Sequence, residues 1–308
     1  MAITRLQHPL NIILAVDGSE HSLAATALLR DLPLPTRSTI SALAVLDQHP
    51  SISQAALVIA LEQVQTLLRE KGVKVTTELL HGHPAAALAK YADEHSPDLI
   101  VLGAKGLRAT LGILLGGIAQ QMVEYAHWPV LVVRAPYTRL RRILLVTDGS
   151  TSSEHTADYL ARFSIPPDAD LRVAHVLPPP RWLYATAAFG PIVPGMMAPL
   201  PSGEVEEVIA AQVEEEKRRG QALLAQTLER LRSWGVEASS ALLQGDAATE
   251  IIEYVKTNQV DLVVSGSRGL SQVQGWLLGS VSRKLVHYAG CSVLVVKGRP
   301  EPASAPMQ

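Results

Sequence analysis

Two glycine patterns with the same spacing are the residues of this chain best suited to bind a ligand. In each pattern two glycines are separated by two residues and a third follows after nine more, at Gly103, Gly106 and Gly116 and again at Gly266, Gly269 and Gly279. Glycine lets the backbone take positive φ or approach a ligand closely, and free amides at the start of a following helix bind anions. One such pair marks an ordinary turn just as readily, but two copies with identical spacing favour a loop that holds phosphate.

The residues that follow the two patterns offer different donors. Ser280, Val281 and Ser282 follow the second pattern, whereas Gly117 and Ala119 stand in place of the two serines in the first. A serine hydroxyl can donate a hydrogen bond to a phosphate oxygen. The sequence therefore predicts a nucleotide site in the second half and a weaker or empty one in the first.

Charged residues accompany both loops. Arg268 lies inside the second loop and Lys105 inside the first, where each either contacts phosphate or faces solvent. Asp17 and Asp148 each precede a Gly-Ser pair at the end of a predicted strand, so each carboxylate either caps the next helix or accepts a ribose hydroxyl. Both interpretations of the carboxylates stay open, because one carboxylate can do both.

The usual motifs of nucleotide enzymes are absent from the sequence. Neither GxGxxG nor GxxxxGK[ST] occurs, which argues against a typical dinucleotide dehydrogenase or a P-loop NTPase. His81 and His83 form a close pair without a third ligand, so we expect no zinc site there, and the single Cys291 has no base near it in sequence, so we expect a core residue and not a nucleophile. No turnover reaction is predicted. Two rivals stay open, namely a slow ATPase or nucleotidyl-transfer enzyme and a non-binding scaffold for protein contacts.

The chain contains an internal repeat. Asp17 and Asp148 are 131 residues apart, as are Val45 and Val176, whereas the two glycine patterns are 163 residues apart. The additional residues enter as a Pro-rich insertion at 178–203. The predicted domains are therefore 1–137 and 138–308, the second with this insertion.

Each half alternates short β-branched runs with longer helical patterns, which indicates a parallel sheet covered by helices on both faces. The predicted elements of the first half are strands at 12–16, 40–46, 73–80, 99–103 and 130–134 and helices at 19–30, 53–71, 84–95 and 114–125. The second half repeats this order, with a long charged helix at 204–234. The predicted fold class is α/β, with two tandem flavodoxin-like or Rossmann-like units, each with a five-stranded parallel sheet.

Composition narrows the partners and the location. The chain has 308 residues, 47% of them hydrophobic, which excludes general disorder and suggests two domains. Its 27 basic and 29 acidic residues give no overall positive field to attract nucleic acid. The sequence has no apolar run long enough to span a bilayer and no signal-peptide core, so we expect no membrane partner and a cytoplasmic location.

The Asp at the end of the first strand and the GxxGx9G[ST] spacing after the fourth strand resemble the universal stress protein family. The resemblance covers nearly the whole chain as two tandem copies. In the ATP-binding members, the first-strand Asp and the second-strand Val hold the adenosine, and the glycines and following Ser hold the phosphates. The resemblance implies ATP contacts at Thr147, Asp148, Val176, Gly266, Gly269, Gly279, Ser280 and Val281 in the second copy and at Val16, Asp17, Val45, Gly103, Gly106 and Gly116 in the first.

The resemblance also implies an architecture and a role. The expected strand order is 3-2-1-4-5, which brings the ends of strands one and four together at the crevice where α/β sheets bind ligands. The last strands, 130–134 and 293–297, are expected to pair antiparallel between the halves. The implied role is an ATP-binding, nucleotide-responsive regulatory or protective factor in stress response, with Mg²⁺ near Asp148. A homodimer and a protein partner of unknown identity are left open.

The Pro-rich insertion is unusually apolar for a free loop, with Trp182, Tyr184, Phe189, Met196 and Met197. Since it leaves the carboxyl end of the second strand of its half, it is expected to fold as a lid over the adenosine end or the partner domain. A disordered linker is the alternative.

Overall fold

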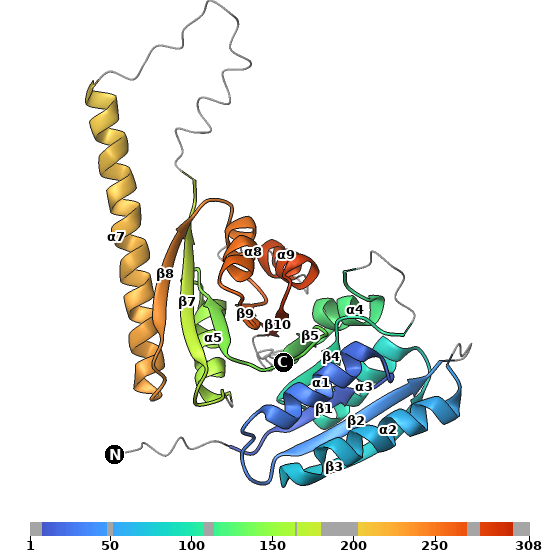
Figure 1. The fold of residues 1–308 in the computed structure, drawn as a ribbon. Helices are drawn as coiled ribbons and strands as arrows, with labels where there is room; N and C mark the ends of the chain where they lie inside the picture. The colour runs from blue at the N-terminus through green and yellow to red at the C-terminus, as the bar shows by residue number, and fades with distance from the viewer. Residues whose placement is uncertain are drawn as a thin grey trace, which may run out of the picture.

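The computed structural model describes residues 8–47, 52–107, 114–163, 165–179, 203–269 and 278–297. Within them, ten strands form one sheet in the order β3-β2-β1-β4-β5-β10-β9-β6-β7-β8 (Figure 1). The strands are β1 (Asn11–Ala15), β2 (Thr39–Leu46), β3 (Lys74–His81), β4 (Leu99–Gly103), β5 (Val130–Val133), β6 (Arg142–Val146), β7 (Asp170–Leu177), β8 (Ser239–Gln244), β9 (Leu262–Gly266) and β10 (Ser292–Val296). Each half has the predicted order 3-2-1-4-5, and the α/β class is confirmed.

Helices cover both faces of the sheet, because its central strands are apolar on both sides and each side must be buried. One apolar layer packs under α1 (Glu20–Asp31), α2 (Gln54–Leu68), α5 (Thr151–Arg162) and α7 (Gly203–Ser233). The other packs under α3 (Pro84–His95), α4 (Gly117–Tyr125), α8 (Ala247–Thr257) and α9 (Ser280–Tyr288). The two units are thus three-layered and share one continuous sheet.

The predicted element boundaries hold to within one or two residues at most ends, with two larger differences. The helix predicted at 53–71 ends as an α-helix at Leu68 and continues as a 3₁₀ turn, η1 (Arg69–Lys71). The helix predicted from 114 begins at Gly117, because Gly116 has an extended backbone with ψ 152° and is its N-cap.

The two units meet at their last strands, β5 and β10, as predicted. These strands pair antiparallel, with Val132 opposite Val293 and Val130 opposite Val295, whereas all the other strand pairs of the described sheet are parallel. A β5 or β10 edge left unpaired would be an apolar template for aggregation. Pairing them within one chain removes both edges.

Two cations strengthen this junction. Arg134, after β5, donates to the carbonyls of Val286 (2.8 Å) and His287 (3.1 Å) at the end of α9. Lys297, after β10, donates to the carbonyl of Val123 at 2.6 Å, at the end of α4. Each unit therefore caps a helix C-terminus of the other, where a positive charge is favourable.

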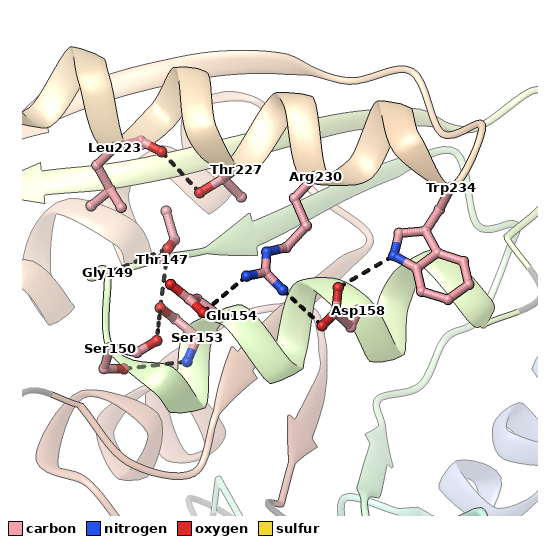
Figure 2. Close-up of polar contacts among 10 residues, drawn as sticks. All are labelled: Thr147, Gly149, Ser150, Ser153, Glu154, Asp158, Leu223, Thr227, Arg230 and Trp234. Atoms are coloured by element: carbon pink, nitrogen blue, oxygen red, sulfur yellow. Dashed lines mark hydrogen bonds and ion pairs between the residues drawn. The ribbon is translucent and has the colours of Figure 1, made fainter.

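The second unit fastens α7 to α5 with polar contacts (Figure 2). Arg230 bridges Glu154 and Asp158, each at 2.9 Å, and the Trp234 indole donates to Asp158 at 3.3 Å. The predicted close-range pairs on the charged helix are also present, with Glu215 accepting from Arg218 and Arg219.

The insertion separates β7 from α7. Residues 180–202, including Trp182 and the other apolar side chains of the predicted lid, lie outside the described residues. In the described part of the chain, no helix combines the length and apolarity that a bilayer span requires.

Candidate functional site

A cavity of about 400 Å³ opens at the carboxyl ends of the first unit's strands. It lies between the ends of β1, β2 and β4 and the starts of α3 and α4, where open α/β sheets bind ligands. All six residues predicted for the first copy line it: Val16, Asp17, Val45, Gly103, Gly106 and Gly116. The half expected to be weaker or empty thus contains a formed cavity large enough for a small ligand.

The cavity has an apolar interior and a polar rim. Its interior is lined by leucines from strands and helices on both sides of the sheet, namely Leu43, Leu57, Leu88, Leu102 and Leu115. Its other polar side chains are the loop cation Lys105, which was expected to contact either phosphate or solvent, and three residues that were not predicted, Asp47, His83 and Gln121. Asp47 just after a predicted strand and His83 just before a predicted helix could have been recognised by position, whereas Gln121 lies in the middle of α4 and has no such signal. Such a mixture suits a flat base with a polar tail.

Asp17 ties the first helix to the glycine loop. Its carboxylate accepts from the amide of Ser19 at 2.9 Å and from the amide of Leu107 at 3.2 Å. The Ser19 hydroxyl caps α1 and also donates to the carbonyl of Lys105 at 3.1 Å. The turn interpretation of Asp17 is therefore present in the structure. The half-buried carboxylate also lines the cavity, where its remaining lone pairs can accept a hydroxyl.

The glycines of both patterns have negative φ, contrary to one expectation. Positive φ occurs instead at Gly18 and Gly149, in the turns after β1 and β6. A Cβ on Gly103 would lie 2.8 Å from the backbone carbonyl carbon of His21, and one on Gly106 would lie 2.6 Å from Asp17 Oδ2. These glycines allow a close approach between segments of the protein, which shapes the cavity wall.

The start of α4 faces the cavity without a side-chain cap. Gly116 is the N-cap, its amide donates to the carbonyl of Ala104 at 2.8 Å, and no side chain accepts from the first turn. By contrast, Ser19 caps α1 and Ser53 caps α2. The first amides of a helix need an acceptor. Since Gly117 and Ile118 line the cavity, an anionic group bound there can supply one.

The second unit repeats this backbone arrangement. Asp148 accepts from the amide of Ser150 at 3.0 Å, and a Cβ on Gly269 would lie 2.6 Å from its carboxylate. A Cβ on Gly266 would lie 2.7 Å from the hydroxyl of Ser152 on α5. Gly279 is the N-cap of α9, with no side-chain cap.

Two side chains predicted to contact nucleotide in the second unit are instead part of its core. Ser282 is buried and donates to the carbonyl of Gly266 at 2.6 Å, so its hydroxyl joins α9 to β9. Thr147 is also buried and donates to Ser153 at 3.2 Å (Figure 2). Ala119, equivalent to Ser282, is buried as well. Its lack of a hydroxyl therefore removes an internal hydrogen bond rather than a donor to a ligand.

The remaining predicted residues of the second unit have varied exposure. Arg268 and Ser280 are exposed at the loop and at the start of α9, while Val176 and Val281 are partly buried against the apolar layer under α8 and α9. Of these four residues, the exposed Arg268 and Ser280 have side chains that can donate a hydrogen bond to a ligand.

The described residues do not include a group of three or more His, Cys, Asp or Glu side chains arranged to hold a metal. The first-unit cavity offers Mg²⁺ only the carboxylates of Asp17 and Asp47 among its described lining residues, and both oxygens of Asp17 already accept amides. Cys291 is buried, and burial raises the pKa of its thiol to about 12, as befits a core residue. His175 is half-buried, and its ring contacts the carbonyl of Thr147 at 2.9 Å.

Comparisons with known proteins agree with this architecture. The universal stress protein family model matches residues 10–134 and 139–297. A universal stress protein of Mycolicibacterium smegmatis is 29% identical over 321 residues, which cover 94% of this chain and 97% of that protein. Universal stress protein MJ0531 of Methanocaldococcus jannaschii is 33% identical over 139 residues, which cover 41% of this chain and 82% of that protein.

Solved structures show the same fold. A universal stress protein from Archaeoglobus fulgidus matches with a TM-score of 0.63 at 18% identity, covering 94% of this chain and 98% of that chain. One from Pseudomonas aeruginosa matches with a TM-score of 0.60 at 16% identity, covering 95% of each chain. Because the family model matches both halves, this chain belongs to the universal stress protein family as a tandem of two domains.

Proposed function

We propose that this protein binds an adenine nucleotide and acts as a nucleotide-responsive regulatory or protective factor in stress response. The observation that supports this most directly is the first-unit cavity, which combines an apolar interior with the uncapped start of α4. Leucine side chains suit the base, the Asp17 carboxylate suits a ribose hydroxyl, and the α4 amides suit a phosphate. Helix α9 of the second unit also lacks a side-chain cap, so the proposal extends to both units. The cytoplasmic location and the homodimer remain predictions.

The simplest test identifies any nucleotide that the protein retains. Purified full-length protein is denatured, and the released small molecules are identified by mass spectrometry. Calorimetry then measures the affinity of nucleotide-free protein for ATP, ADP and AMP. The proposal expects a released adenine nucleotide or measurable binding. The absence of heat with any adenine nucleotide in well-folded protein would contradict it.

Variants locate the site. A Cβ on Gly116 would lie 3.4 Å from the carbonyl oxygen of Ala104, which is an ordinary contact, so Gly116→Val can fold while its methyl groups cover the α4 amides. Gly279→Val covers the α9 amides of the second unit, where a Cβ would lie 3.3 Å from the carbonyl oxygen of Ser267, so the loop must move by a few tenths of an ångström. Gly290→Val is the matched control, because a Cβ there meets no atom within 4 Å and the residue does not line the cavity. We expect at least about tenfold weaker binding at each altered site and no change in the control. ADP formation that one substitution abolishes would favour a slow ATPase instead.

A further inference from the structure

The two units differ at the positions on α4 that line the first-unit cavity and at their equivalents on α9. Gly117 and Gln121 line the first-unit cavity. Their equivalents, 163 residues later on α9, are Ser280 and Lys284. The second unit therefore has a hydroxyl and an ammonium group that the first lacks.

The rim of the first-unit cavity has more carboxylate groups than ammonium groups. Asp17 and Asp47 contribute two carboxylates to the lining, and Lys105 contributes its ammonium group. Gln121, in the middle of α4, and His83, the N-cap of α3, also line the cavity. A highly charged anion in this cavity would meet more negative charge than the positive charge of Lys105 can balance.

Among the equivalent groups of the second unit, the two cations Arg268 and Lys284 balance the two carboxylates Asp148 and Asp246, so this unit lacks the excess of negative charge found in the first. Arg268 takes the place of Lys105, and Lys284 adds a second cation. Lys284 lies 3.6 Å from Asp246, which takes the place of His83 and caps α8. Asp47 has Pro178 as its equivalent, so the second unit lacks the carboxylate of that position.

From this difference we propose that the first-unit cavity binds an adenine nucleoside or nucleoside monophosphate in preference to the triphosphate. Gly117 and Gln121 set this preference by withholding the donors that Ser280 and Lys284 offer. The α4 amides can accommodate one phosphate, but each further phosphate adds negative charge near Asp17 and Asp47 without a new cation. This inference rests on the proposed function, because it takes the adenine ring as given.

The test removes the second site and compares ligands at the first. The full-length Gly279→Val protein is titrated by calorimetry with adenosine, AMP and ATP without Mg²⁺. We expect AMP to bind at least about tenfold more tightly than ATP. Equal or tighter ATP binding would overturn this inference and leave the proposed function standing. If none of the three ligands binds, the proposed function fails for the first unit, and this inference fails with it.

A second pair of variants avoids dependence on Gly279→Val. Lys284→Glu weakens the second site through charge alone, without touching its backbone, and the same titrations follow. Adding Gly117→Ser and Gln121→Lys then gives the first unit the donors of the second. A Cβ on Gly117 meets no atom within 4 Å, so the serine fits. We expect the AMP-to-ATP preference to fall by about tenfold, whereas Gln65→Lys, an equal charge change on an exposed position of α2, should leave it unchanged. An unchanged preference after Gly117→Ser and Gln121→Lys would overturn the inference.

Discussion

The two units share one strand order but join their helices by different chemistry. In the second unit, Arg230 on α7 bridges Glu154 and Asp158 on α5 (Figure 2). At the positions equivalent to Arg230 and Glu154, the first unit has Leu67 and Leu23, which are 39% and 38% exposed. The repeated backbone tolerates either arrangement on its outer surface. The fold must therefore be specified by the buried residues beneath these helices.

The inner faces differ as well, next to the predicted nucleotide loops. Ser265 and Ser282 form a buried hydrogen-bonded pair at 3.1 Å in the second unit. Their equivalents in the first unit are Leu102 and Ala119, both buried and both lining the cavity. An apolar pair thus extends the hydrophobic wall of the first-unit cavity, whereas the polar pair holds α9 to β9 in the second unit. Equivalent positions line a cavity in one unit and form an internal hydrogen bond in the other.

Arg134 and Lys297 are equivalent residues of the two units, and the larger effect is expected from Arg134. Arg134→Ala would leave the carbonyls of Leu114, Val286 and His287 without their donor. Because hydrogen bonds from charged groups are among the stronger ones, we expect a loss of about 3 to 4 kcal/mol in the free energy of unfolding. Urea denaturation measures it. Arg139→Ala, which removes an exposed pair with Asp168, is the control and should lose less than about 1 kcal/mol. If Arg134→Ala and Arg139→Ala lowered the free energy of unfolding equally, the contacts of Arg134 would not stabilise the junction.

The first glycines of the two patterns should differ in their tolerance of a methyl group. Gly103→Ala would press against the backbone of α1 at His21, which can yield only by moving the helix. Gly266→Ala would first meet the hydroxyl of Ser152, which can rotate away. We expect losses of about 3 and about 1 kcal/mol in unfolding free energy, respectively. The reverse order in thermal or urea denaturation would show that α1 is less firmly placed than α5.

A pH titration should separate Lys297 from Arg134. Burial, with Arg268 nearby, lowers the pKa of Lys297 from 10.5 to about 8. Between these values the unfolded chain binds more protons than the folded one, so the free energy of unfolding rises as the pH increases from about 8 to 10.5. We expect a rise of about 2 kcal/mol in the free energy of unfolding. This is less than the full pKa shift would give, because water still reaches part of the Lys297 side chain. Lys297→Arg should lose this rise, since arginine stays charged across the range. A rise retained in that variant would assign it to another group.

Exchanging the outer contacts should have the smallest effect. Glu154→Leu combined with Arg230→Leu gives the second unit the residues found at the equivalent positions of the first. Exposed ion pairs contribute little, and a leucine pair can replace their packing, so the unfolding free energy should change by less than about 1 kcal/mol. Arg230→Leu alone should be the more destabilising, because it leaves Glu154 and Asp158 without their shared cation. A double variant worse than the single one would show that the ion pairs specify the α5–α7 contact.

Much of this architecture was predictable because it depends on local pattern. The apolar run Val130–Val133 is buried throughout, and Pro84 begins α3 at the predicted residue. The glycine spacing marked both loops, whereas the six first-copy residues that line one cavity were named by the family resemblance. Such features rest on hydrophobic periodicity and residue conformational preference, which act over a few residues.

What sequence alone determined about this protein is the repeated unit, its parallel sheet and the segments that end at the ligand edge. Tertiary packing alone decided the direction of the polar side chains at that edge. Thr147 and Ser282 turn into the core, and Asp47 and Gln121 both line the cavity, because helices from distant segments fix which side chains are covered. The contact between Arg134 and Val286 likewise joins residues 152 apart in the chain. No local preference encodes such a distance, so it exists only once the two units have paired.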